Sequence, residues 1–204
     1  EIMAGMGAKV VISSRKAEAC EPVAAGIAKA GGEATVIPCN VSRKEDVETL
    51  VKKTLDTYGR IDCMVANAAV SPYFGPMSGM DDDAFDKLMN VNVKSTLWLA
   101  NFCRPAMEAQ GGGTVLIISS IAGIRSTGNL GGYGISKAAD FGVARALAVG
   151  AAPALAALDA NAWSWLEVAS GVPRIVAATV ERFVPQMVNF EVVGGENFQK
   201  GCYP

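Results

Sequence analysis

Residues 8–41 read AKVVISSRKAEACEPVAAGIAKAGGEATVIPCNV, and this stretch decides the fold. Its first residues, 8–14, form a compact β-branched run that is typical of a strand buried on both faces. Residues 17–30 have helical character and end at Gly31-Gly32, a pair that suits a helix C-cap. Residues 33–41 return to strand character. The stretch therefore predicts a strand–helix–strand unit with parallel strands.

The same alternation continues as far as about residue 149. Ser42, followed by Glu45, is a capping-box pattern that predicts the start of the next helix. Gly5 and Gly7 lead into the first strand and are expected at a helix-to-strand turn. Further strands are expected at residues 61–66 and 114–119, and further helices at residues 81–109 and 133–149. The pattern predicts an α/β fold, a doubly wound parallel sheet with helices on both faces.

Composition excludes several classes of protein. Of the 204 residues, 50% are hydrophobic and the net charge is -2, so neither disorder nor a general attraction to nucleic acid or membranes is expected. No uncharged apolar stretch reaches the roughly 20 residues of a bilayer span. The five cysteines include no C-x-x-C pair, which favours a reduced, cytoplasmic setting over a zinc site or disulfides. The chain has no histidine, which excludes Ser-His-Asp and Cys-His catalysis and leaves no metal site expected.

Candidate chemistry lies where the predicted strands end, because ligands of such sheets bind at the carboxyl ends of the strands. Tyr133 and Lys137 lie four residues apart on a predicted helix, so they share one face. A nearby ammonium favours a phenolate, which would make the tyrosine a usable acid or base. The pair could equally be incidental, since Tyr-x-x-x-Lys is a common match.

Two more polar residues precede this pair. Ser120 follows a predicted strand and could donate a hydrogen bond to a substrate oxygen, or simply cap the turn. Asn92 sits between Val91 and Val93 in a predicted helix, although asparagine is a mediocre helix former. It is either a surface residue or an internal amide that kinks the helix and fixes a water.

Taken together, Asn67-Ala68-Ala69, Asn92, Ser120, Tyr133 and Lys137 resemble, in order and spacing, the short-chain dehydrogenase/reductase family, and in particular its carbonyl-reductase-like members. The resemblance implies a Rossmann fold and hydride transfer between a nicotinamide cofactor and a carbonyl or alcohol. It implies that Tyr133 is the general acid or base, that Ser120 polarises the carbonyl, and that Lys137 assists the tyrosine and holds the nicotinamide ribose. Asn92 would position a water that relays protons to Lys137.

The cofactor site implied by the resemblance lies at the ends of the first three strands of this chain. Asn67, Ala68 and Ala69 would line the groove for the adenosine. A carboxylate at the end of the strand at residues 8–14 would bind the ribose 2′-hydroxyl of NAD, but this position is Ser14. Arg15 and Lys16 follow it, and a hydroxyl beside two cations suits the 2′-phosphate of NADP. NADP(H) is therefore expected over NAD(H). Asn40 stands where the family has an aspartate facing the adenine, and the adjacent Val41 belongs to the same expected site.

The chain also departs from the family. Its glycine-rich turn after the first strand is absent, so the first strand is expected to be missing and the sheet incomplete. The natural N-terminus is expected upstream of Glu1, so a targeting segment before Glu1 remains an open alternative. The resemblance stops at about residue 149, and no Pro-Gly pair follows. We therefore expect a partial Rossmann domain at residues 1–149 and a divergent segment at residues 150–204, for which a frameshift or splice difference is one explanation.

Two functions remain open from the sequence. The first is an NADP(H)-dependent reductase or dehydrogenase acting on a small carbonyl or alcohol. The second is an inactive fragment or pseudoenzyme that acts only through oligomerisation. A homodimer or homotetramer is expected in both cases, because the helices that hold Asn92 and Tyr133 pack against a neighbouring subunit in the family.

Overall fold

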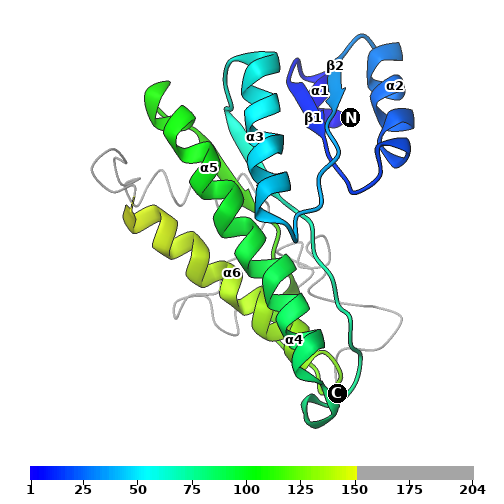
Figure 1. Cartoon of the computed structure of the whole chain (residues 1–204), viewed down its shortest axis with the longest axis vertical. Coiled ribbons are helices and arrows are strands. Elements are labelled where there is room, and N and C mark those ends of the chain that lie inside the picture. Colours follow the sequence, from blue (N-terminus) through cyan, green and yellow to red (C-terminus); the bar gives the residue numbers. More distant parts are fainter. Residues whose placement is uncertain (151–204) are drawn as a thin grey trace, which may run out of the picture. The chain divides into compact units, whose positions relative to one another are not determined.

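The computed structural model describes residues 1–150, drawn in colour in Figure 1. The expected divergent segment at residues 150–204 lies, apart from Gly150, outside the described residues. The chain begins with a short helix, α1 (Ile2–Gly5), followed by Gly7 with φ +92°. This left-handed conformation, which favours glycine, makes the predicted helix-to-strand turn before β1.

The first strand–helix–strand unit forms as predicted. Strands β1 (Lys9–Ile12) and β2 (Glu33–Val36) pair in parallel, with Lys9 opposite Glu33 and Ile12 opposite Val36. The connection runs through η1 (Ala17–Ala19) and α2 (Glu21–Lys29), and α2 packs against β2. Just beyond α2, Gly31 has φ +82°, the left-handed conformation that suits the predicted end of the helix.

The second unit has the same topology. Strands β3 (Cys63–Ala66) and β4 (Thr114–Ile117) also pair in parallel. Between them lie η2 (Met77–Gly79), α4 (Asp82–Met89), a π-helical segment η3 (Asn90–Lys94), and α5 (Ser95–Ala109). The single helix predicted at residues 81–109 is thus interrupted by one π-helical turn. Its start is fixed by Asp81, whose carboxylate accepts a 2.7 Å hydrogen bond from the Ala84 N–H.

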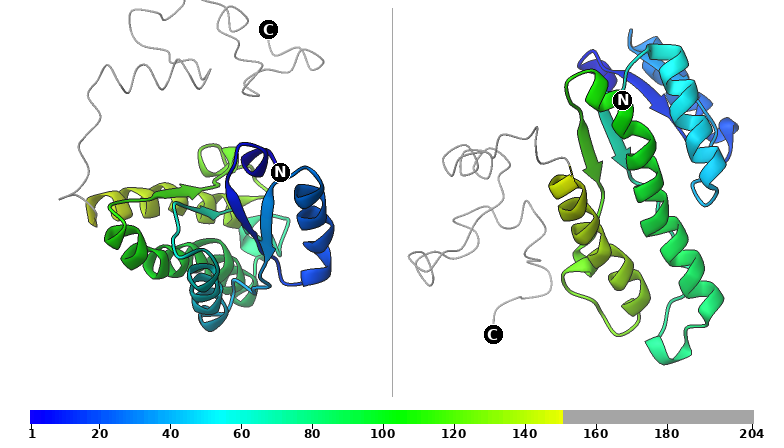
Figure 2. Two further views of the ribbon diagram at one scale, coloured as in Figure 1. Left: turned by 90° about the horizontal axis from the view of Figure 1, so that it is seen from above. Right: turned by 60° about the vertical axis from the view of Figure 1, so that its left-hand side comes forward.

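The four strands of the described residues form two separate parallel pairs, and β1 is not hydrogen-bonded to β3 (Figure 2). A doubly wound sheet that lacks its central strand divides into two such pairs, and this agrees with the missing first strand expected from the sequence. The expectation that residues 8–14 are buried on both faces is wrong, since β1 is only half-buried and much of β4 is exposed.

Helices α3 (Lys44–Tyr58) and α5 lie side by side (Figure 1), and together with β3 they enclose a buried apolar cluster. Its buried members are Val51, Ile61, Met64, Ala100, Cys103 and Met107. The predicted capping box at Ser42 is wrong. Helix α3 starts one residue later, after Arg43, and the Ser42 hydroxyl instead donates to Asn40 Oδ1 at 2.8 Å.

The last described helix, α6 (Gly131–Gly150), follows η4 (Ile121–Gly123). It packs against η4, η3 and α4, and these contacts bring the ends of the second unit together. Among the described helices, none is both long enough and apolar enough to cross a membrane.

Candidate active site

The loop after β4 is locked onto α6 by two close contacts. Ser119 Oγ donates a 2.8 Å hydrogen bond to the carbonyl of Lys137. A Cβ added at Gly123 would lie 2.7 Å from that same carbonyl, so only glycine lets η4 approach the helix backbone this closely. Ser120, between these two contacts, is therefore held beside the helix that carries Tyr133 and Lys137.

Ser120 begins η4 and is half-buried. Its Oγ accepts a 3.2 Å hydrogen bond from the Ala122 N–H, so it caps the turn, as one of the two interpretations predicted. Within the described part of the chain, its hydroxyl hydrogen has no acceptor. The cap uses only a lone pair, and the O–H can still donate to a substrate oxygen.

Tyr133 and Lys137 share one face of α6 but are not bonded to each other. Lys137 is 4% exposed, and its Nζ donates to the carbonyl of Ile118 at 2.7 Å and to Asp140 Oδ2 at 3.1 Å. Tyr133 is half-buried, and its hydroxyl forms no hydrogen bond with any described residue. The phenol is therefore open to a ligand, while the ammonium is already engaged by this chain.

Asp140, the partner of Lys137, is 2% exposed. Burial raises the pKa of Asp140 above its ordinary value, and the hydrogen bond and charge of Lys137 oppose that rise. Its other carboxylate oxygen, Oδ1, is buried without a hydrogen-bond partner among the described residues. Among the described residues, the ion pair with Lys137 is therefore what offsets the cost of burying the Asp140 carboxylate.

Asn92 lies in the π-helical segment and is 2% exposed, so the surface interpretation is wrong. Its Oδ1 accepts from the Val70 N–H at 2.8 Å, and its Nδ2 donates to the Val70 carbonyl at 2.9 Å and to Ser136 Oγ at 2.9 Å. One amide therefore joins the loop after β3 to α6. Single π-helical turns inside α-helices frequently lie at functional sites.

Replacing Asn92 with Ala is expected to lower the free energy of unfolding by about 2–3 kcal/mol, because three hydrogen bonds are lost and Ser136 is fully buried. Urea unfolding of the full chain measures this change. Asn101→Ala, at an exposed position of α5, is the matched control and should change stability by less than about 0.5 kcal/mol. Equal losses in the two variants would contradict a structural role for the Asn92 amide.

The residues expected at the phosphate end of the cofactor come together where β1 and β2 end. The Cys39 N–H donates to the Ser14 carbonyl at 2.9 Å, which places Asn40 and Val41 next to Ser14. The Ser14 hydroxyl donates to the Lys16 carbonyl at 2.8 Å and accepts from the Lys16 N–H at 3.2 Å. Arg15 is exposed and makes no ion pair with any described residue.

A chain of hydrogen bonds connects these residues with the second unit. Asn40 Oδ1 accepts from Ser42, and the Ser42 carbonyl accepts from Asn90 Nδ2 at 3.0 Å. Asn92, two residues further along, holds the loop after β3. That loop presents Asn67, Ala68 and Ala69, which are all exposed. Hydrogen bonds thus link the end of β2 to η3 through Ser42, and link η3 to the loop after β3 and to α6 through Asn92.

The comparison with protein families is decisive. A family model described as enoyl-(acyl carrier protein) reductase matches residues 1–162. The chain belongs to the short-chain dehydrogenase/reductase family. It is 41% identical over 133 residues to the pig protein "Dehydrogenase/reductase SDR family member 4", which covers 65% of this chain and 48% of that protein. The chain spans about half the length of the curated relatives it matches.

Solved structures of the family confirm the Rossmann fold. A metagenomic short-chain oxidoreductase in complex with NADP is 32% identical with a TM-score of 0.70, over 73% of this chain and 67% of that one. A 7α-hydroxysteroid dehydrogenase complexed with NADH and 7-oxo glycochenodeoxycholic acid is 31% identical with a TM-score of 0.68, over 72% and 57%. These relatives show an oxidoreductase family whose members bind NADP or NAD.

Within this family member, Cys39 and Cys103 do not supply an alternative acid or base. Burial, with a smaller effect from the charge of Asp46, raises the pKa of the Cys39 thiol to about 11. Burial raises the pKa of the Cys103 thiol to about 11 as well. Both stay protonated near neutral pH. The described residues also include no group of three or more side chains that could hold a metal ion.

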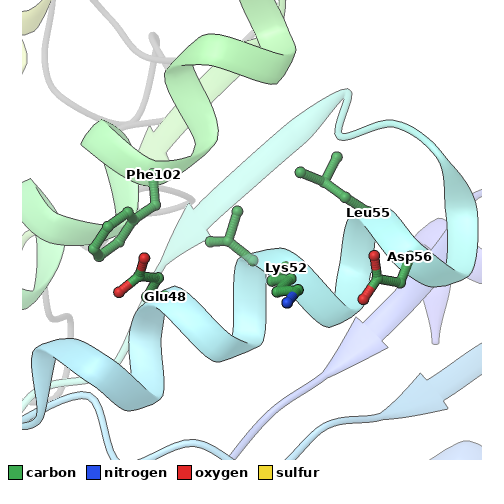
Figure 3. A pocket seen from close by; sticks show the side chains of 6 residues that line it. Glu48, Lys52, Leu55, Asp56 and Phe102 are labelled. Carbon is green, nitrogen blue, oxygen red and sulfur yellow. The ribbon is translucent and has the colours of Figure 1, made fainter.

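A cavity of about 340 Å³ lies elsewhere, between α3 and α5 (Figure 3). It is lined by Glu48, Val51, Lys52, Leu55, Asp56 and Phe102. Phe102 closes it from α5, and the charged side chains come from α3. None of the residues expected to bind cofactor or substrate lines this cavity.

Sequence reasoning missed several residues that shape the site. Ser119 bonds to the backbone carbonyl of Lys137, and Ser136 bonds to the Asn92 amide. Asp140 forms an ion pair with the Lys137 ammonium. A usable signal existed for Asp140, because it lies three residues after Lys137 on the same helix face, among apolar residues. The roles of the two serines depend on contacts across the fold that have no local signal.

Proposed function

We propose that this chain forms the hydride-transfer site of an NADP(H)-dependent oxidoreductase that interconverts a carbonyl and an alcohol. The observation that carries the proposal is the placement of Ser120 beside the helix of Tyr133 and Lys137 by the Ser119 and Gly123 contacts. A hydroxyl donor and a phenol that act on one substrate oxygen must lie close together, and these contacts support that arrangement. Family membership supplies the reaction class.

The described side chains suggest a division of labour. In the direction of reduction, the Ser120 O–H donates to the carbonyl oxygen and stabilises the negative charge that develops there. The Tyr133 hydroxyl, which has no partner in the described chain, gives its proton to that oxygen, and in oxidation the phenolate takes the proton back. The nicotinamide cofactor, when bound, supplies or accepts the hydride.

The first role of Asn92 is to position two other parts of the site. Its amide holds the loop of Asn67–Ala69 and the Tyr133 helix at a fixed distance through Val70 and Ser136. Both of its N–H groups are used in these bonds. The proton-relay water expected from the family resemblance stays a prediction, and such a water would have to bind to acceptor atoms there.

The donor set after β1 fits the phosphate of NADP(H). Arg15 and Lys16 are exposed and follow directly after Ser14, with no carboxylate bonded to either among the described residues. A guanidinium of this kind binds a phosphate by two parallel hydrogen bonds. Asn67, Ala68 and Ala69 leave room for the adenosine, and Asn40 offers an amide at the end of β2. The Ser14 hydroxyl is occupied by Lys16, so we assign the phosphate to the cations.

Replacing Arg15 with Ala is expected to reduce the preference for NADPH over NADH about tenfold, because one charge-assisted phosphate contact of about 1.5 kcal/mol is lost. Calorimetric binding of the two cofactors to the full chain measures the preference without requiring turnover. Arg60→Ala is the matched control, since Arg60 is exposed at the opposite end of β3. An unchanged preference in Arg15→Ala would refute the phosphate role.

A second function, a non-catalytic family member that acts through self-association, is favoured by two observations. Among the described strands β1 pairs only with β2 and β3 only with β4, and the Lys137 ammonium is already bonded to Asp140. Oxidation of NADPH in the presence of a panel of ketones and quinones separates the two functions. NADPH binding and turnover support the oxidoreductase, whereas a stable oligomer without NADPH binding supports the second function. We further propose a cytoplasmic homodimer or homotetramer in either case.

A further inference from the structure

The Asn40 side chain is fixed at the end of β2 by Ser42. Its Oδ1 accepts two hydrogen bonds from this residue, one from the Ser42 N–H at 3.2 Å and one from the Ser42 hydroxyl at 2.8 Å. A backbone N–H can only donate, so the side-chain atom that faces it is the amide oxygen and not the amide nitrogen. The acceptor of this amide is therefore used within the chain.

The backbone around this amide is held as well. The Asn40 N–H donates to Asp46 Oδ2 at 3.2 Å, and the Asn40 carbonyl accepts from the Arg43 N–H at 2.9 Å. Asn90 Nδ2 donates to the Ser42 carbonyl at 3.0 Å, which ties the same turn to η3. Asn40 is half-buried, and its Nδ2 bonds to no described residue. The two N–H groups of Nδ2 are thus what Asn40 offers to a ligand.

Asn40 lies beside the residues that we assign to the phosphate of NADP(H). The Cys39 N–H donates to the Ser14 carbonyl at 2.9 Å, so the end of β2 lies next to the turn that carries Arg15. The 2′-phosphate and the purine of NADP are attached to the same ribose, and nucleotides bind at the carboxyl ends of such strands. A phosphate bound at Arg15 therefore brings the base of the cofactor to the neighbouring strand end, where Asn40 lies.

We propose that Asn40 donates a hydrogen bond to the purine of the bound dinucleotide and accepts none from it. This inference rests on the proposed function in taking this strand end as part of the cofactor site. It reverses the contact of the aspartate that the family resemblance implies at this position, because a carboxylate can only accept.

The direction of this hydrogen bond decides which purine suits the site. A donor suits N7, which is an acceptor in adenine and in guanine, and it suits an acceptor at the 6-position. Adenine carries an amino group there, which is a donor, whereas hypoxanthine carries a carbonyl oxygen as guanine does. Asn40 should therefore favour a hypoxanthine base, relative to adenine, more than an aspartate at the same position would.

The test is calorimetric binding of NADPH and of reduced nicotinamide hypoxanthine dinucleotide phosphate to the full chain. The two dinucleotides have the same phosphates and differ only in the base, so the ratio of their dissociation constants isolates the contact with the base. Asn40→Asp keeps an oxygen for Ser42 and replaces the Nδ2 donor with a carboxylate oxygen. It is expected to shift the ratio about tenfold in favour of NADPH. An unchanged ratio, or a shift toward the hypoxanthine form, would overturn the proposal.

Asn40→Ala keeps the test decisive if Asn40→Asp does not fold. It removes the donor without adding a charge, so the ratio is expected to shift about threefold toward NADPH, because the hypoxanthine form loses a hydrogen bond at its 6-position. The absence of this shift would contradict the proposal. Asn101→Asp, which adds the same charge at an exposed position of α5, is the matched control and should leave the ratio unchanged.

Asp46 is the competing acceptor, because its carboxylate lies against the Asn40 N–H. If Asp46→Asn abolishes a preference for NADPH that Asn40→Asp leaves unaltered, Asp46 recognises the base and the proposal is wrong. A chain that binds neither dinucleotide loses the proposed function and this inference with it. A chain that binds both, with one ratio in the parent and in Asn40→Asp, keeps the proposed function and loses this inference alone.

Discussion

Replacing Tyr133 with Phe is expected to lower kcat/KM for NADPH-dependent reduction by about 100- to 10,000-fold, the usual contribution of a positioned general acid. Phenylalanine keeps the aromatic ring and removes only the hydroxyl. That hydroxyl has no partner among the described residues, so its loss should leave the fold and the cofactor affinity unchanged. Steady-state kinetics with a reducible ketone and calorimetry with NADPH measure the two effects separately.

Tyr73→Phe is the matched control for this experiment. The Tyr73 hydroxyl donates to the Pro76 carbonyl at 3.0 Å within its own loop and touches none of the catalytic candidates. Its removal is expected to change kcat/KM by less than about twofold, since the half-buried Tyr73 hydroxyl bonds only within its own loop. Equal activity in the parent and in Tyr133→Phe would refute the role of the phenol and favour the non-catalytic alternative.

The second large effect concerns stability. Replacing Lys137 with Met is expected to cost about 3–5 kcal/mol in the free energy of unfolding, because it leaves the Asp140 carboxylate buried and unpaired. Adding Asp140→Leu should recover most of this loss, since a buried apolar pair replaces the ion pair. Urea unfolding of the parent, both single variants and the double variant gives the coupling between the two residues.

The pH dependence of the Lys137→Met variant provides a further check. The pKa of Asp140 is raised in the fold above its ordinary value of 3.8, and loss of the ammonium removes the opposing effect. The folded carboxyl therefore takes up its proton at a higher pH than the unfolded one. The penalty is fully present at pH values above the pKa of the folded carboxyl, and it should shrink as the pH falls from there toward the ordinary value. A deficit independent of pH would mean that the unpaired charge is not its cause.

Much of the fold could be predicted from the sequence, because its elements are marked by local patterns. The β-branched run at residues 8–14 and the glycines at residues 31–32 predicted β1 and the end of α2, and both predictions are confirmed. Prediction failed where distant contacts compete with local ones. Ser42 and Glu45 match the sequence pattern of a capping box. In the structure, however, the Ser42 hydroxyl donates to Asn40 Oδ1, and the Ser42 carbonyl accepts from Asn90 Nδ2.

The candidate site divides along the same line. The sequence by itself determined the family, the order of Asn92, Ser120, Tyr133 and Lys137, and the cations after β1, because residue type and spacing along one helix or after one strand carry that information. Only the tertiary structure decided that Asn92 is buried, that Gly123 brings the Ser120 turn onto α6, and that the Lys137 ammonium binds Asp140 rather than the phenol. The physical reason is that burial and charge pairing depend on which groups the fold brings within hydrogen-bonding distance, and no local pattern records those distances.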